Sequence, residues 1–206
     1  MSIEKYEDLN AMQIDVLREV GNIGSGNATT ALSSMVGKMI DIEVPNVEVL
    51  DFNEAIEAVG GPEKIIAGIL IRINGDVDGM IMFLFEQNLI SLIIETFFGS
   101  APNDIFSLNE AEISALHEMG NIMAGSYVNA IAQLAGLTID VEVPLMTIDM
   151  LGAIMSVPAI EMGEMGDKLL FIDNNMVIDK TSIQSKMLLL PTIDSLGNLL
   201  GKLGVA

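Results

Sequence analysis

The chain has 206 residues, 50% of them hydrophobic, which is enough to bury a sizeable core as one domain or as two halves. It has no cysteine, which excludes disulfides and thiolate metal sites and suits a reducing cytoplasm. Its formal net charge of −20 argues against nucleic acid and anionic membrane surfaces as partners, because both attract Lys and Arg. The acidic residues 1–10 lack an apolar signal-peptide core, and no apolar run approaches the ~20 residues of a membrane span, so we expect a cytoplasmic protein.

The sequence repeats itself at a fixed offset of 99 residues. Residues 15–45 align without a gap with residues 114–144. The residues of the first copy that recur unchanged in the second are Leu17, Glu19, Gly21, Asn22, Ile23, Gly26, Ala31, Gly37, Ile40, Asp41, Glu43, Val44 and Pro45. Chance is a poor explanation of these matches at one offset. We therefore predict a single domain made of two repeats, about 10–100 and 109–206.

The first predicted element is a helix over residues 11–36. Small and apolar residues recur in it at spacings of three and four, the period of one helical face. They are Ile14, Leu17, Gly21, Gly24, Ala28, Ala31 and Met35, and the second copy has Ile113, Leu116, Gly120, Met123, Tyr127, Ala130 and Leu134. Because this row passes through the glycines, we predict that the helix does too, and that Gly21 and Gly24 allow close packing. A phosphate-binding glycine loop is disfavoured, since such a loop follows a strand and opens a helix.

The rest of the first half has a strand pattern followed by a helix. The β-rich runs 64–73 and 78–85 flank the turn sequence NGDVDG and predict a hairpin. Residues 86–99 then predict a helix that Gly99 closes. The turn-rich residues 99–109 join the two halves.

The second half follows the same order. Its long helix precedes predicted strands over 153–160, 168–173 and 186–191 and an amphipathic closing helix over 192–204. We therefore predict an α+β fold, an internally duplicated pseudo-twofold domain. Its sheet is expected to be largely antiparallel, and two equivalent long helices are expected to carry the repeated motif.

A polar row lies opposite the apolar row on each long helix. The first copy has Asp15, Glu19, Asn22 and Gly26 there, and the second has Ser114, Glu118, Asn121 and Gly125. A single such row is usually a plain solvated surface. Packing does not constrain outward residues, however, and asparagine is a mediocre helix former, so its recurrence favours a function. Gly26 and Gly125 would leave the backbone bare for the close approach of a partner.

The chain offers few groups for other kinds of catalysis. His117 is the only histidine, so a nucleophilic triad is excluded and a zinc site is disfavoured. His117 itself is better explained as an exposed helix residue than as a ligand. Asp76 and Asp78 resemble part of a calcium loop, but the remaining ligands are missing, so a hairpin turn is the better explanation.

Glutamate and asparagine one turn apart suit the handling of a phosphorylated protein. A carboxamide accepts one hydrogen bond from water while donating another, and it has no charge to repel a phosphoryl group. A glutamine positions water in this way in GTPases. The neighbouring glutamate is suited to pair with a lysine beside the phosphate. The motif brings no metal of its own, so a metal would arrive with the substrate, which favours a phosphoprotein over a small phosphate ester.

At these residues the sequence resembles the CheC-type chemotaxis phosphatases, which include CheX and FliY relatives. The family pattern is Asp or Ser, three residues, Glu, two residues, Asn, then twenty-two residues and Pro. It stands here as Asp15, Glu19, Asn22 and Pro45, and again as Ser114, Glu118, Asn121 and Pro144. The family's duplicated architecture covers essentially the whole chain. Because it has two complete copies of the motif, the chain is more similar to CheC than to CheX. The absence of a switch domain after residue 206 disfavours FliY.

The resemblance implies a hydrolase that removes the aspartyl phosphate of the response regulator CheY. Asn22 and Asn121 would position the attacking water in the regulator's active site. Glu19 and Glu118 would meet a lysine there. The regulator would supply Mg²⁺, so the chain would need no cofactor of its own.

The resemblance also implies supporting roles and a second partner. Asp15 and Ser114 would tune the surface, whereas Pro45 and Pro144 would be structural. The receptor deamidase CheD is a further expected partner. Two alternatives stay open: a non-catalytic adaptor that binds the regulator or CheD, and a component of the flagellar switch.

Overall fold

A computed structural model describes residues 5–42, 46–162, 168–178 and 181–205. The helices are α1 (Ala11–Val36), α2 (Phe52–Val59), α3 (Gln87–Phe98), α4 (Glu110–Ala135), α5 (Leu151–Met162) and α6 (Ile193–Lys202), with 3₁₀ turns η1 (Tyr6–Asp8) and η2 (Ile105–Ser107). The strands are β1 (Ile40–Ile42), β2 (Asn46–Asp51), β3 (Ile65–Gly75), β4 (Gly79–Phe85), β5 (Ile139–Val141), β6 (Leu145–Met150), β7 (Lys168–Ile178) and β8 (Thr181–Pro191). The first 3₁₀ turn, long helix and two short strands of each half thus recur at the 99-residue offset.

The strands form one antiparallel sheet, as predicted. Its order is β1-β7-β8-β4-β3-β5, with β2 also paired to β7 and β6 also paired to β3. The hairpins β3–β4 and β7–β8 meet where β4 pairs with β8, from Gly79 opposite Pro191 to Phe85 opposite Ser185. The two halves therefore share one continuous sheet, and the predicted α+β fold class is confirmed.

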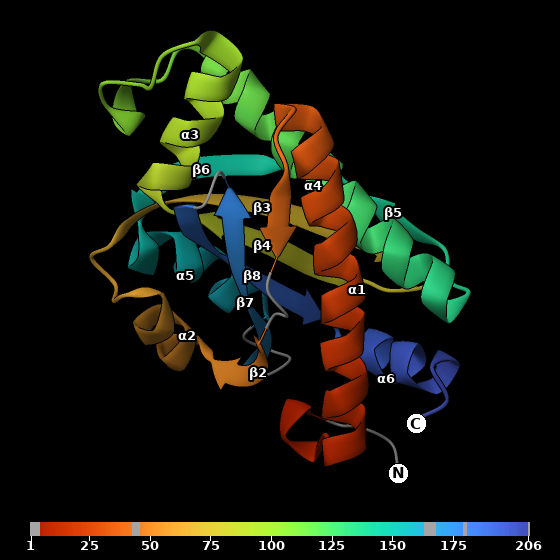
Figure 1. The fold of residues 1–206 in the computed structure, drawn as a ribbon. Coiled ribbons are helices and arrows are strands. Elements are labelled where there is room, and N and C mark those ends of the chain that lie inside the picture. The colour runs from red at the N-terminus through yellow and green to blue at the C-terminus, as the bar shows by residue number, and fades with distance from the viewer. Residues whose placement is uncertain (1–4, 43–45, 163–167, 179–180, 206) are drawn as a thin grey trace.

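Helices cover both faces of this sheet (Figure 1). The larger core cluster joins α1, α3, α4 and α6 to one face, and the smaller cluster joins α2 and α5 to the other. The long helices α1 and α4 pack against each other above the sheet. Each buries one side in the larger core and turns its other side outward, as the predicted rows require.

Both long helices begin and end in the same way. Asn10 caps α1 by accepting from the Gln13 N–H at 3.0 Å, and Asn109 caps α4 by accepting from the Glu112 N–H at 3.1 Å. The side chains of Gln13 and Glu112 return the bond to the cap backbone, which completes a capping box at each helix. Each helix ends at a left-handed residue that glycine supplies without strain, Gly37 or Gly136, both with φ of 65°. The repeated motifs are therefore held on two helices of matched length.

Glycines let these helices pack closely, as predicted. A Cβ added at Gly24 would lie 2.4 Å from the ring of Tyr127 on α4, and one at Gly120 would lie 2.7 Å from Ile69 on β3. The Tyr127 ring thus fills the space that Gly24 leaves on the neighbouring helix. Its hydroxyl is fully buried, and burial raises its pKa above the ordinary value.

The predicted strand over residues 153–160 is wrong, because these residues belong to α5. The buried residues of α5 are Leu151, Ile154, Met155, Pro158 and Met162, which is helical spacing. Pro158 lies inside this helix, a position at which proline is disfavoured, so the residue pattern offered little indication of a helix there. The apolar row predicted for α4 is also wrong at its two ends, because Ile113 and Leu134 are exposed and not part of the core. In the described part of the chain, no helix has the length and apolar character of a membrane span.

Candidate catalytic faces

The first copy of the motif lies along the outer side of α1 and is called the first face (Asp15, Glu19 and Asn22). Asp15 and Glu19 are exposed, and Asn22 is half-buried. Asp15 accepts a hydrogen bond from the Arg18 guanidinium at 2.8 Å, and Arg18 also donates to the Val47 carbonyl at 3.4 Å. Asp15 is thus tied to its own helix. The fourth motif residue of this copy, Pro45, lies outside the described residues.

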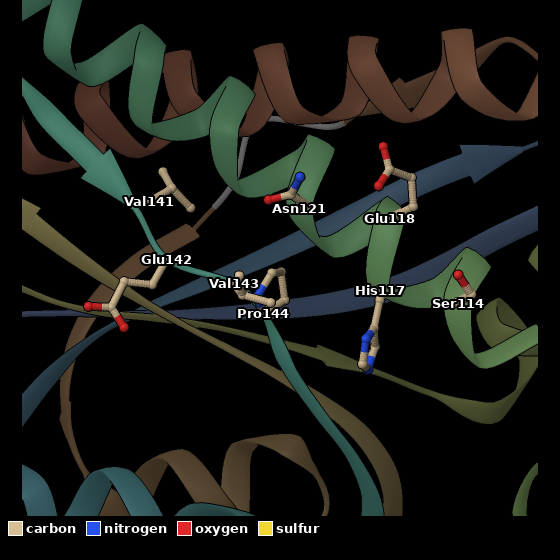
Figure 2. A pocket seen from close by; sticks show the side chains of 8 residues that line it. All are labelled: Ser114, His117, Glu118, Asn121, Val141, Glu142, Val143 and Pro144. Carbon is tan, nitrogen blue, oxygen red and sulfur yellow. The ribbon is translucent and has the colours of Figure 1, made fainter. Parts of the chain in front are cut away.

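The second copy forms the second face (Ser114, Glu118, Asn121 and Pro144). The first three are exposed on α4, and Pro144 is buried just before β6. They line a cavity of about 240 Å³ together with His117 and the segment Val141–Val143 (Figure 2). Val143 is 83% exposed. The cavity is therefore a shallow hollow on the surface, with the carboxamide of Asn121 on its wall.

His117 departs from its expected setting. It is half-buried and projects from α4 on the side of Pro144, where it lines the cavity (Figure 2). The expectation missed this because the chain from β5 to Pro144 returns against α4, a contact between segments far apart in sequence. The available signal was Pro144 itself, whose fixed distance from Asn121 in the motif indicates that the two segments meet. Among the described residues, His117 has no hydrogen-bond or ion-pair partner.

The two faces stay separate. The cavity at the second face contains no residue of the first copy. Gly26 and Gly125 are half-buried, and a Cβ added at either would meet nothing within 4 Å. Both positions therefore leave a strip of open backbone one turn beyond the asparagine, as their predicted role in close approach requires.

Neither face gathers metal ligands from the described residues. In that part of the chain, no three His, Cys, Asp or Glu side chains lie close enough to hold an ion together. Asp76 and Asp78 serve the β3–β4 turn instead. Asp76 accepts from the Thr138 N–H at 2.8 Å, and Asp78 accepts from the Gly75 N–H at 3.3 Å. The hairpin-turn explanation of these two residues is confirmed.

Comparison with known proteins relates this chain to chemotaxis. A sequence model of the CheC-like family matches residues 12–49 and 112–148, the segments that hold both motif copies. The CheY-P phosphatase CheC of Bacillus subtilis (strain 168) is 34% identical over 206 residues, which is 98% of each chain. The chain belongs to the CheC-like family.

Other known proteins share parts of this chain or its fold. The flagellar motor switch phosphatase FliY of Bacillus subtilis (strain 168) is 29% identical over 143 residues, 69% of this chain and 37% of that protein. The crystal structure of Thermotoga maritima FliY superposes with a TM-score of 0.75 at 20% identity, covering 95% of this chain and 98% of that one. The latter likeness shows a common fold.

The second face presents two polar side chains on the outer side of α4. Glu118 and Asn121 are three residues apart on α4, so their side chains are neighbours. Within the described residues neither is held by a hydrogen bond, so both are free to contact another molecule. A carboxylate and a neutral carboxamide are thus offered together on a rigid helix.

Proposed function

We propose that this protein hydrolyses the aspartyl phosphate of the phosphorylated response regulator CheY. The observation that carries the proposal is the double presentation of Glu and Asn on the outer sides of two matched helices. Packing gives no reason for asparagine at these positions. Support also comes from the relative named CheY-P phosphatase CheC, which matches 98% of this chain.

In this proposal the asparagines act on water. The carboxamide of Asn22 or Asn121 enters the regulator's site and orients a water molecule in line with the phosphorus. The water oxygen forms a bond to phosphorus, the bond to the aspartate oxygen breaks, and inorganic phosphate and a free carboxylate result. Positioning of this kind and electrostatic stabilisation supply most of the catalysis in phosphoryl transfer.

The remaining chemistry is divided between the two proteins. Glu19 and Glu118 pair with a regulator lysine and fix the register of docking. The regulator supplies Mg²⁺, which neutralises charge on the phosphoryl oxygens. We also propose that the reaction takes place in the cytoplasm and that the receptor deamidase CheD is a second partner, to be tested by co-purification.

The test is the lifetime of the phosphorylated regulator with substoichiometric amounts of this protein. The double variant Asn22→Ala/Asn121→Ala should lose the acceleration and keep the melting temperature, because both side chains project outward. The matched control is Asn129→Ala, an exposed asparagine on α4 outside the motif, which should behave as the parent protein. Normal dephosphorylation by the double variant would show that the asparagines do not position the water.

A second candidate is a phosphatase that acts as part of the flagellar switch. The relative FliY, whose name places it there, favours it. Co-purification of this protein with switch components would support this candidate, whereas activity on the free regulator without such association would favour the first. A non-catalytic adaptor would bind the regulator and leave its lifetime unchanged.

A further inference from the structure

An apolar groove of about 220 Å³ lies beside the second face and is called the Phe106 groove. It is lined by Ile105, Phe106 and Leu108 around η2, by Ile113 on α4, and by Met146, Thr147 and Ile148 on β6. Phe106 is 60% exposed. An exposed aromatic ring on the rim of an apolar hollow is typical of a protein contact surface rather than of a free surface.

The Phe106 groove and the cavity of the second face are lined by residues that are neighbours in the sequence. Ile113 in the groove precedes Ser114 in the cavity, and Met146 lies two residues beyond Pro144. A stable protein interface buries roughly 800 Å² on each partner, much more than a few motif side chains provide. A globular partner seated on Asn121 must therefore extend over neighbouring surface, and this groove, with the exposed Phe106 on its rim, is an apolar surface near that site.

The fold does not require an exposed aromatic ring at this place, because the described residues of the first half put carboxylates there. At the 99-residue offset, Phe106 corresponds to Glu7, and Thr147 corresponds to Glu48. Both glutamates are exposed, and η1 forms the same 3₁₀ turn as η2. Tyr6, which corresponds to Ile105, is buried and donates to the Pro191 carbonyl at 2.7 Å. The exposed Phe106 thus serves something other than the turn that carries it.

We propose that the Phe106 groove is the docking surface that the second face uses for its response regulator, taking an apolar side chain that the regulator presents beside its phosphorylated aspartate. This inference rests on the proposed function and adds to it a difference between the faces. The second face holds the regulator by apolar contact as well as through Glu118. The first face, with Glu7 and Glu48 in the corresponding places, offers carboxylates instead.

Proteins in which only one face keeps its asparagine test this proposal. Asn22→Ala leaves only the second face active, and Asn121→Ala leaves only the first face active. Adding Phe106→Glu to Asn22→Ala should raise KM for the phosphorylated regulator about tenfold or more while kcat changes little, because the contact is lost in binding rather than in the chemical step. Adding Phe106→Glu to Asn121→Ala should change neither constant. Phe106→Glu installs the residue that the first half already carries in its own turn, so the fold should persist.

Ile160→Glu is the matched control, because Ile160 is 79% exposed and lies on α5, across the sheet from α4. It adds the same charge and should leave KM unchanged. The proposal is overturned if Phe106→Glu leaves KM of the second face unchanged, if Ile160→Glu raises KM equally, or if both single-face proteins respond alike. It is also overturned if Phe106→Glu dissociates an oligomer without weakening regulator binding, since the groove would then join copies of this chain.

A failure of the proposed function gives a different result. In that case the Asn22→Ala protein would not shorten the lifetime of the phosphorylated regulator at all. The groove is then judged by the affinity for regulator carrying beryllofluoride as a phosphoryl mimic, which needs no hydrolysis. Weaker binding of the Phe106→Glu protein supports the groove, and unchanged binding rejects it.

Discussion

At the scale of single residues, the decisive property of Asn121 is a neutral group that both donates and accepts. Asn121→Asp keeps the size of the side chain, but it replaces the amide donor by an oxygen and adds a negative charge. The added charge would face the phosphoryl group. In the Asn22→Ala background we expect this change to lower the dephosphorylation rate constant by about 10²-fold, the usual loss when one such positioned group is removed.

The control for this substitution is Glu118→Gln, which removes a charge from the same face. It should weaken regulator binding and leave the rate at saturation nearly unchanged, because Glu118 is proposed to fix the register of docking rather than to position the water. Titration of the rate against regulator concentration separates the two effects. An Asn121→Asp protein with full activity would contradict the water-positioning role.

Outward residues on the long helices were the most predictable part of the site. Helical period alone places Glu19, Asn22, Glu118 and Asn121 away from the core, and the structure has them there. His117 was missed because its surroundings come from the return of the Pro144 segment against α4. The Arg18–Asp15 pair that distinguishes the first face also depends on side-chain conformations, which no period encodes.

At the scale of elements, Gly24 and Gly26 of α1 have opposite surroundings: one is tightly packed and the other faces open space. A Cβ at Gly24 would meet the Tyr127 ring at 2.4 Å, whereas one at Gly26 would meet nothing. Gly24→Ala should therefore destabilise the protein by about 1–3 kcal/mol through overpacking between α1 and α4. Gly26→Ala should stabilise it by up to about 1 kcal/mol, because alanine favours the helix. Urea unfolding of the two variants measures both effects.

The same pair separates stability from function. If Gly26 allows close approach of the regulator, Gly26→Ala will slow dephosphorylation by the first face in the Asn121→Ala background despite its greater stability. Equal stability changes at both glycines would contradict the packing of Tyr127 against Gly24.

The long helices were predictable because 26 residues give several turns of pattern, whereas the 12 residues of α5, with a proline among them, gave too few.

At the scale of the whole molecule, charge is the dominant long-range term. The chain has 29 acidic and 9 basic residues, so folding brings 20 excess negative charges close together. Ion pairs such as Lys64–Glu86 and Arg18–Asp15 are half-buried or exposed and contribute at most about 1 kcal/mol each. Salt weakens both the pairs and the general repulsion, and the repulsion involves many more charges.

We therefore expect the melting temperature to rise between about 10 and 150 mM NaCl, as the Debye length falls from about 30 to 8 Å. Scanning calorimetry at several salt concentrations measures this, with KCl as the control for a specific effect of Na⁺. A melting temperature that falls with salt would mean that the ion pairs outweigh the repulsion of the acidic surface.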